Sequence, residues 1–145
     1  MDHTENIGFK IGALSNLIRR KIDNSRVIKE ANNLTGMHGF IIGYLYDNLG
    51  IKDIFQRDIE TEFSIRRSTV TGIIQLMEKN NLIIRESVNY DARLKKLVLT
   101  PKAIALHEAF IQHILDIETQ LTKGVTEKEI DNFLITLEKL KQNIE

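Results

Sequence analysis

Residues 66–100 read RRSTVTGIIQLMEKNNLIIRESVNYDARLKKLVLT, and two different periodicities follow each other within this segment. The first part carries apolar residues on one helical face, at positions 70, 73, 74 and 77, which predicts a helix over 66–79. Asn80 and Asn81 can end that helix, because asparagine tolerates the left-handed conformation. The segments 82–87 and 95–100 are then rich in β-branched and apolar residues. Together with a polar turn over 88–94 they predict a two-stranded hairpin.

Helical periodicity also predicts three helices before this segment and two after it. The earlier helices are expected over 7–22, 38–48 and 52–62. Thr100-Pro101 is a typical helix start, so a long helix is expected from 101 to about 122. Thr126 and Glu129 form a capping box that opens a last helix, ending near residue 144. The predicted fold is mainly α with a small β-hairpin, in the order α-α-α-α-β-β-α-α.

The segment 52–80 has the pattern of a helix-turn-helix motif. Its second helix begins with small polar and basic residues, as a helix that enters the major groove of DNA requires. These residues are Arg66, Arg67, Ser68, Thr69 and Thr71. The hairpin adds Arg93 at its tip and Lys95 and Lys96 on the returning strand, and an arginine on a narrow hairpin suits the minor groove. The prediction is a winged helix-turn-helix that binds duplex DNA, although each cation taken alone also fits a solvated surface charge.

The outer parts of the chain, 1–34 and 101–145, carry apolar stripes that a single small chain has little means to bury. We interpret them as dimerisation helices around a DNA-binding region over 35–100, within one compact chain. The residues expected in the dimer contact are Ile11, Leu14, Ile18, Phe133, Leu137 and Leu140. The alternative is an intramolecular bundle in a monomer.

The composition is that of an ordinary globular protein, with 145 residues, 42% hydrophobic and 28% charged, and a formal net charge of zero. The charge is uneven, because residues 64–100 hold seven Lys/Arg against three Asp/Glu, which favours a nucleic-acid partner. The absence of cysteine excludes disulfides and thiolate metal sites. No apolar run is long enough to span a bilayer and no signal peptide is visible, so we expect a cytoplasmic protein.

The sequence offers little for catalysis. It contains no phosphate-binding glycine loop and no G-x-S-x-G or H-E-x-x-H motif. His107 and His113 are six residues apart and face different sides of a helix, so they cannot chelate one ion together. We therefore expect no enzyme, no cofactor and no metal site. A further hypothesis is a sensor in which His38, Phe40 and Tyr44 line an effector cavity, the alternative being ordinary core packing.

Several motifs resemble those of the MarR family of bacterial regulators. They are the Ser/Thr-rich run 68–71, the segment 76–83, the triplet Asp91-Ala92-Arg93, and the run 97–103 that begins Leu-Val-Leu-Thr. Leu34-Thr35 also resembles the family, so the likeness covers about 34–103. Three features depart from it: Gly72 stands where many relatives have an arginine, Arg66 where a capping serine is common, and Asn80-Asn81 where glycine is common.

The resemblance implies a triangular homodimer whose two winged domains bind a pseudopalindromic operator, with half-sites about 34 Å apart. It implies a transcriptional regulator, most relatives being repressors that small, often aromatic or phenolic, effectors release from DNA. It assigns Ser68, Thr69 and Thr71 to groove contacts and Arg93 to a wing-tip contact, with Asp91 orienting Arg93 through a charge-assisted bond. The other hypothesis is a dimeric winged protein-interaction module that does not read DNA.

Overall fold

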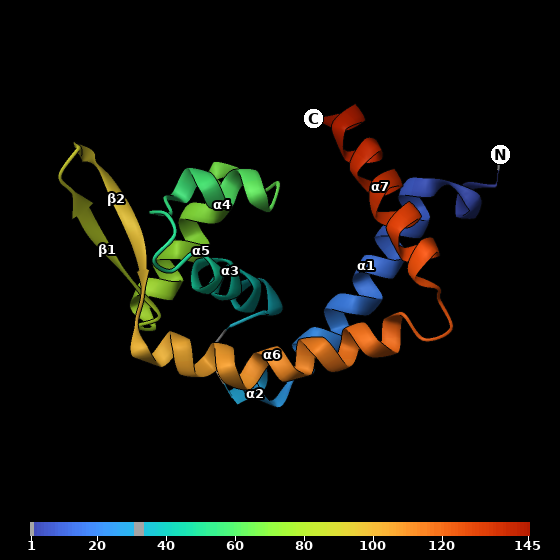
Figure 1. The fold of residues 1–145 in the computed structure, drawn as a ribbon, viewed down its shortest axis with the longest axis horizontal. Coiled ribbons are helices and arrows are strands. Elements are labelled where there is room, and N and C mark those ends of the chain that lie inside the picture. Colours follow the sequence, from blue (N-terminus) through green and yellow to red (C-terminus); the bar gives the residue numbers. More distant parts are fainter. Residues whose placement is uncertain (1, 31–33) are drawn as a thin grey trace.

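The computed structural model describes residues 2–30 and 34–145, and there the chain is mainly helical (Figure 1). The elements are, in chain order, the 3-10 helix η1 (His3–Glu5), α1 (Ile7–Asp23), α2 (Arg26–Glu30), α3 (Gly36–Asp47), α4 (Gln56–Glu62), α5 (Arg67–Lys79), β1 (Ile83–Val88), β2 (Asp91–Leu99), α6 (Pro101–Leu121) and α7 (Glu127–Ile144). The predicted order is confirmed, with the short helices η1 and α2 added to it. Within the described residues the only sheet is the antiparallel hairpin β1–β2.

Two predicted helix boundaries were wrong, and side-chain caps give the reason. Helix α3 begins at Gly36 instead of 38, because the His38 imidazole accepts the backbone N–H of Thr35 at 3.0 Å and so fixes the first turn. Helix α4 begins at Gln56 instead of 52, because the Asp58 carboxylate accepts a backbone N–H just ahead of the helix at 2.8 Å. A side chain that reaches back to the residue before a helix satisfies one of its otherwise unpaired groups.

The hairpin exists as predicted, but its turn is shorter than 88–94. Strand β2 already begins at Asp91, which pairs with Val88 next to an irregularity in the register. The hairpin is also tied to the helices, because the N–H of Leu97 donates to the carbonyl of Ile54 at 2.8 Å, just before α4. The hairpin is therefore held at its base by the chain that leads into the helix-turn-helix.

The caps expected at three other points are confirmed. The Thr126 hydroxyl accepts the N–H of Glu129 at 3.1 Å, and the Glu129 carboxylate accepts the N–H of Thr126 at 2.9 Å. Thr100 caps α6 ahead of Pro101. Asn81 follows α5 with a left-handed φ of 58°. These features could be predicted because each depends on residues adjacent in the sequence.

The core lies where α3, α4, α5 and the hairpin meet α6. Its fully buried side chains are Ile41, Ile59, Val70, Ile74, Met77, Leu82 and Ile83. A second, smaller cluster joins α1, α2 and α6 through Ile22, Ile28, Phe110 and Ile117. The first cluster fixes α5 against the body of the protein, so the opposite side of that helix faces outward.

Helix α6 runs along the base of the molecule and joins its two ends (Figure 1). The hairpin lies at one end, with α3, α4 and α5 beside it. Helices α1 and α7 stand together at the other end, where both termini also lie. No helix within the described residues is long and apolar enough to cross a membrane.

Candidate nucleic-acid interface

Helix α5 presents a polar, cationic start to solvent. Val70, Ile74 and Met77 are fully buried at spacings of four and three, which holds one side of the helix to the core. The predicted contact residues Arg66, Arg67, Ser68 and Thr69 are all exposed. Arg66 is the residue before the helix, and its side chain forms no capping hydrogen bond with the first turn, in agreement with the departure noted in the sequence. The structure thus places these four residues together at one exposed end of α5.

Thr71 lies differently from the other predicted contact residues. It is half-buried, and its hydroxyl donates to the carbonyl of Arg67 at 2.9 Å. The same oxygen accepts a hydrogen bond of 2.8 Å from the side-chain amide of Gln56, the first residue of α4. The hydroxyl proton is therefore already used inside the helix-turn-helix. Sequence reasoning missed Gln56, because a bond across 15 positions of sequence leaves no local pattern.

The hairpin β1–β2 is the wing of the winged helix, and Asp91 and Arg93 lie at its tip. The Asp91 carboxylate accepts the backbone N–H of Arg93 at 2.9 Å and two guanidinium N–H groups, Nε and Nη2, at 3.2 Å each. These hydrogen bonds hold the pKa of the Asp91 carboxyl below its ordinary value. The Arg93 side chain still remains 90% exposed. Asp91 thus orients the Arg93 guanidinium, and the side chain of Arg93 projects into solvent.

The other two predicted wing cations have partners nearer the base of the hairpin. Lys95 donates from Nζ to the Ser87 hydroxyl at 2.6 Å. Lys96 lies 3.7 Å from a carboxylate oxygen of Asp53 and 3.8 Å from one of Glu86. Lys96 is only one-third exposed, so Arg93 is more accessible to a partner than Lys96.

Tyr90 joins the wing to the chain just before α4, and sequence reasoning missed it. The Tyr90 hydroxyl donates to Asp53 Oδ2 at 3.1 Å, and its ring meets that of Phe55 edge-on at 6.5 Å between centroids. The guanidinium carbon of Arg57 lies 5.3 Å from the centroid of the Phe55 ring, which is a cation–π arrangement. Arg57, which sequence reasoning also missed, is exposed and adds a cation at the start of α4.

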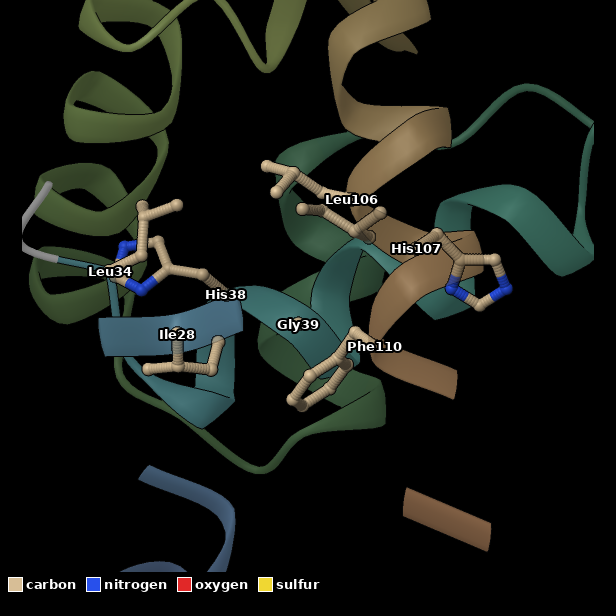
Figure 2. Close-up of a pocket in the computed structure, with 8 residues that line it drawn as sticks. Ile28, Leu34, His38, Gly39, Leu106, His107 and Phe110 are labelled. Atoms are coloured by element: carbon tan, nitrogen blue, oxygen red, sulfur yellow. The ribbon is translucent and has the colours of Figure 1, made fainter. Parts of the chain in front are cut away.

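The residues expected to line an effector cavity are not brought together. His38 is buried, with 5% of its surface exposed, and lines a small cavity of about 20 Å³ between α2, α3 and α6 (Figure 2). Phe40 instead borders a larger cleft, and Tyr44 packs edge-on against Phe63 at 5.9 Å. A cavity of 20 Å³ has room for about one water molecule.

The two ring nitrogens of His38 have different surroundings. Its Nδ1 accepts the N–H of Thr35, while Nε2 has no hydrogen-bond partner among the residues that the structure describes. Burial lowers the pKa of His38, because a charged ring is poorly solvated there. His107 lies on the other side of the cavity, and its ring points away from His38 (Figure 2) and stacks on Tyr46 at 4.4 Å. Across 2–30 and 34–145, no three His, Asp or Glu side chains are close enough together to hold a metal ion.

The larger cleft separates the two ends of the molecule. It has a volume of about 670 Å³ and lies between α1 and α7 on one side and α3 and α5 on the other. The predicted dimer residues Ile11, Leu14, Ile18, Phe133 and Leu137 line it, and Leu140 lies half-buried one turn further along α7. In a single chain these apolar side chains are incompletely covered, since Phe133 is 54% exposed and Leu14 is 42% exposed.

The fold and the exposed α5–wing surface define a winged-helix transcription regulator, and comparisons with known proteins agree. A sequence model described as the MarR family matches residues 32–94. The transcription regulator MarR from Oenococcus oeni PSU-1 is 32% identical, over 94% of this chain and 99% of that chain, with a TM-score of 0.80. At this identity and coverage the chain belongs to the MarR family.

Two more distant structures share the fold. A complex of S. aureus MepR with DNA is 23% identical, covers 100% of both chains and has a TM-score of 0.86. Bordetella bronchiseptica BpsR, solved in a study of how 6-hydroxynicotinic acid regulates its DNA binding, is 19% identical over 97% of this chain and 96% of that chain, with a TM-score of 0.81. At these identities the likeness concerns the fold alone.

Proposed function

We propose that this MarR-family regulator binds duplex DNA with the exposed start of α5 in the major groove and Arg93 in the adjacent minor groove. The main support for the proposal is that hydrogen bonds connect the wing to the chain that leads into the helix-turn-helix. Tyr90 bonds to Asp53, and Leu97 bonds to Ile54, so the two groove-reading parts form one unit. A unit of this kind presents its cations with a fixed spacing, as simultaneous contact with two grooves requires.

We also propose that the operator-binding form is a homodimer joined by α1, α6 and α7. Among the 18 residues of α7, all of which the structure describes, none is buried, although Phe133, Leu134 and Ile135 are apolar. An amphipathic helix gains most of its stability from packing its apolar face, so a second copy is the partner that fits. In this proposal the parts 1–34 and 101–145 dimerise and the part 35–100 binds DNA. Two-fold symmetry then requires a pseudopalindromic operator.

The proposed role is that of a repressor that a small aromatic or phenolic ligand releases from DNA. The support is the cleft of about 670 Å³ between the arms, α1 and α7, and the DNA-binding part. Its α3 side, lined by Met37 and Phe40, includes none of the residues assigned to the dimer contact, so a ligand held there would contact the DNA-binding part directly. The relative BpsR, whose DNA binding 6-hydroxynicotinic acid regulates, offers a precedent in the same fold. The proposal gives the protein no catalytic role and places it in the cytoplasm, where its DNA partner is.

The test is selection of bound sites from random duplex DNA, followed by binding titrations of the full-length protein at several salt concentrations. We expect a palindrome with one-turn spacing, and a logarithm of affinity that falls steeply and linearly with the logarithm of salt. Arg93→Ala should weaken binding several-fold and reduce the salt slope by about one, whereas Lys123→Ala, which removes an exposed cation far from the wing, should not. Affinity that barely depends on salt would favour a protein-interaction module instead.

A further inference from the structure

The outward face of α5 is defined by four residues that lie opposite its buried side. Ser68, Gly72, Gln75 and Lys79 follow one another at spacings of four, three and four, so they share one face of the helix. All four are exposed, whereas Val70, Ile74 and Met77 on the other side are fully buried. If α5 enters a groove, this is the face that meets the base edges.

Gly72 in the middle of this face has no structural explanation among the described residues. A Cβ placed there would meet none of their atoms within 4 Å. At Gly39, by contrast, a Cβ would overlap the Phe110 ring, so close packing requires that glycine. Glycine in a helix interior is less stable than alanine. Glycine at this position therefore lowers stability, and no contact within 2–30 and 34–145 offsets that cost.

Gln75 lies one turn further along the same face, with an unused side-chain amide. It is exposed, and it forms no hydrogen bond within the part of the chain that the structure describes. Gln56, Gln112 and Gln142 do form such bonds, to Thr71 at 2.8 Å, to Asp116 at 3.0 Å and to Glu138 at 3.4 Å, whereas Gln120 on α6 is unbonded like Gln75 within the described residues. A glutamine amide supplies one donor and one acceptor side by side, which matches the N7 and N6 edge of adenine in the major groove.

We propose that Gly72 is bare so that α5 can approach the floor of the major groove closely, and that Gln75 there reads an adenine in each half-site. The proposal rests on the proposed function and assigns it two specificity-determining residues. Close approach and base reading belong together, because a side-chain amide reaches a base edge only if nothing larger keeps the helix away. Thr71, whose hydroxyl proton is already donated to Arg67, is assigned to positioning α5 instead.

The first test is site selection from random duplex DNA with the full-length protein and two variants of Gln75. Gln75→Ala should lose the preference for adenine at one position of each half-site and bind the selected operator about tenfold more weakly. Gln75→Glu should move that preference toward cytosine, whose amino group an acid can accept. Unchanged preference at every position in both variants would overturn the assignment of Gln75.

The second test adds a methyl group at Gly72. Gly72→Ala should raise the melting temperature by about 3 °C, because alanine favours the helix, and yet weaken operator binding at least about tenfold. The matched control is Gly43→Ala in α3, where a Cβ would stand 3.5 Å from His107 Cε1, an ordinary contact distance, and DNA affinity should not change. A Gly72→Ala protein that binds the operator as tightly as the wild type would overturn the close-approach role.

The outcomes also separate this proposal from the function on which it rests. If the wild-type protein enriches no site and its affinity for DNA barely depends on salt, the DNA-binding function itself is wrong and this inference falls with it. If the wild type selects a palindrome but the variants at Gly72 and Gln75 behave like it, only the inference is wrong.

Discussion

Replacing His38 with glutamine should remove a pH dependence from the folding stability of the protein. The imidazole is buried, and its Nδ1 accepts the N–H of Thr35 at 3.0 Å, at the start of α3. A proton on that nitrogen would break the bond and place a charge in an apolar site. Glutamine suits the third position of a capping box, so His38→Gln keeps an acceptor for Thr35 without a group that titrates near neutrality.

The sign and size of the effect follow from the lowered pKa of His38. In the unfolded chain the ring takes up a proton as the pH falls through its ordinary pKa of about 6.5. In the folded chain it resists protonation, so the unfolded state gains protons first and stability is lost below pH 6.5, not above it. The loss is at most about 1.4 kcal/mol per pH unit, hence at most about 2 kcal/mol between pH 7 and pH 5.

The assay is urea unfolding of wild type and His38→Gln at pH 7, 6 and 5, at one fixed protein concentration, because a dimer's stability depends on concentration. The variant should be less stable by about 1–2 kcal/mol at pH 7, and the gap should narrow as the pH falls. His3→Gln, which removes an exposed histidine from η1, is the control for the substitution of histidine by glutamine. The reasoning is refuted if His38→Gln loses as much stability as the wild type between pH 7 and pH 5.

Two further predictions concern the wing and the arms. Tyr90→Phe removes the hydroxyl bonded to Asp53 and keeps the ring against Phe55, so it should lower the stability of the fold by at most about 1 kcal/mol. In a gel-shift titration it should weaken operator binding two- to threefold, about 0.5 kcal/mol. An unchanged affinity would show that this hydrogen bond does not hold the wing in place. Leu137→Asp places a carboxylate in the apolar seam of α7 and should convert the dimer to a monomer in size-exclusion chromatography; a variant that still elutes as a dimer would place the interface elsewhere.

The parts of the fold that the sequence predicted well are those that depend on neighbouring residues. The capping box of Thr126 and Glu129 and the Thr100-Pro101 helix start were correct, because a cap is formed within three or four positions. The buried face of α5 was also correct, since its apolar residues repeat with the helical period. The five-residue helix α2 was not predicted, because one turn is too short to show a period.

The features of the site that escaped prediction depend on tertiary contacts. Gln56 and Tyr90 have no motif of their own, and their partners Thr71 and Asp53 are far away in the sequence. The grouping of His38 with Phe40 relied on closeness in sequence. Positions two apart in a helix differ by about 200° in direction, so the two side chains face nearly opposite sides. Helical geometry applied at that step would have separated them.

Helix α6 is one unbroken rod of 21 residues that begins at the end of β2 and reaches the loop before α7. Its length is about 31 Å, so a tilt of about 10° at the arm end would swing the hairpin end by about 5 Å. A ligand bound beside α1 and α7 could therefore change the distance between the DNA-binding regions, residues 35–100, of the two protomers in a dimer. Because the wing is hydrogen-bonded to the helix-turn-helix, such a ligand would most easily change the distance between the two DNA-binding regions of the dimer. The helical repeat of DNA fixes the distance between half-sites, so any other distance between these regions would weaken binding.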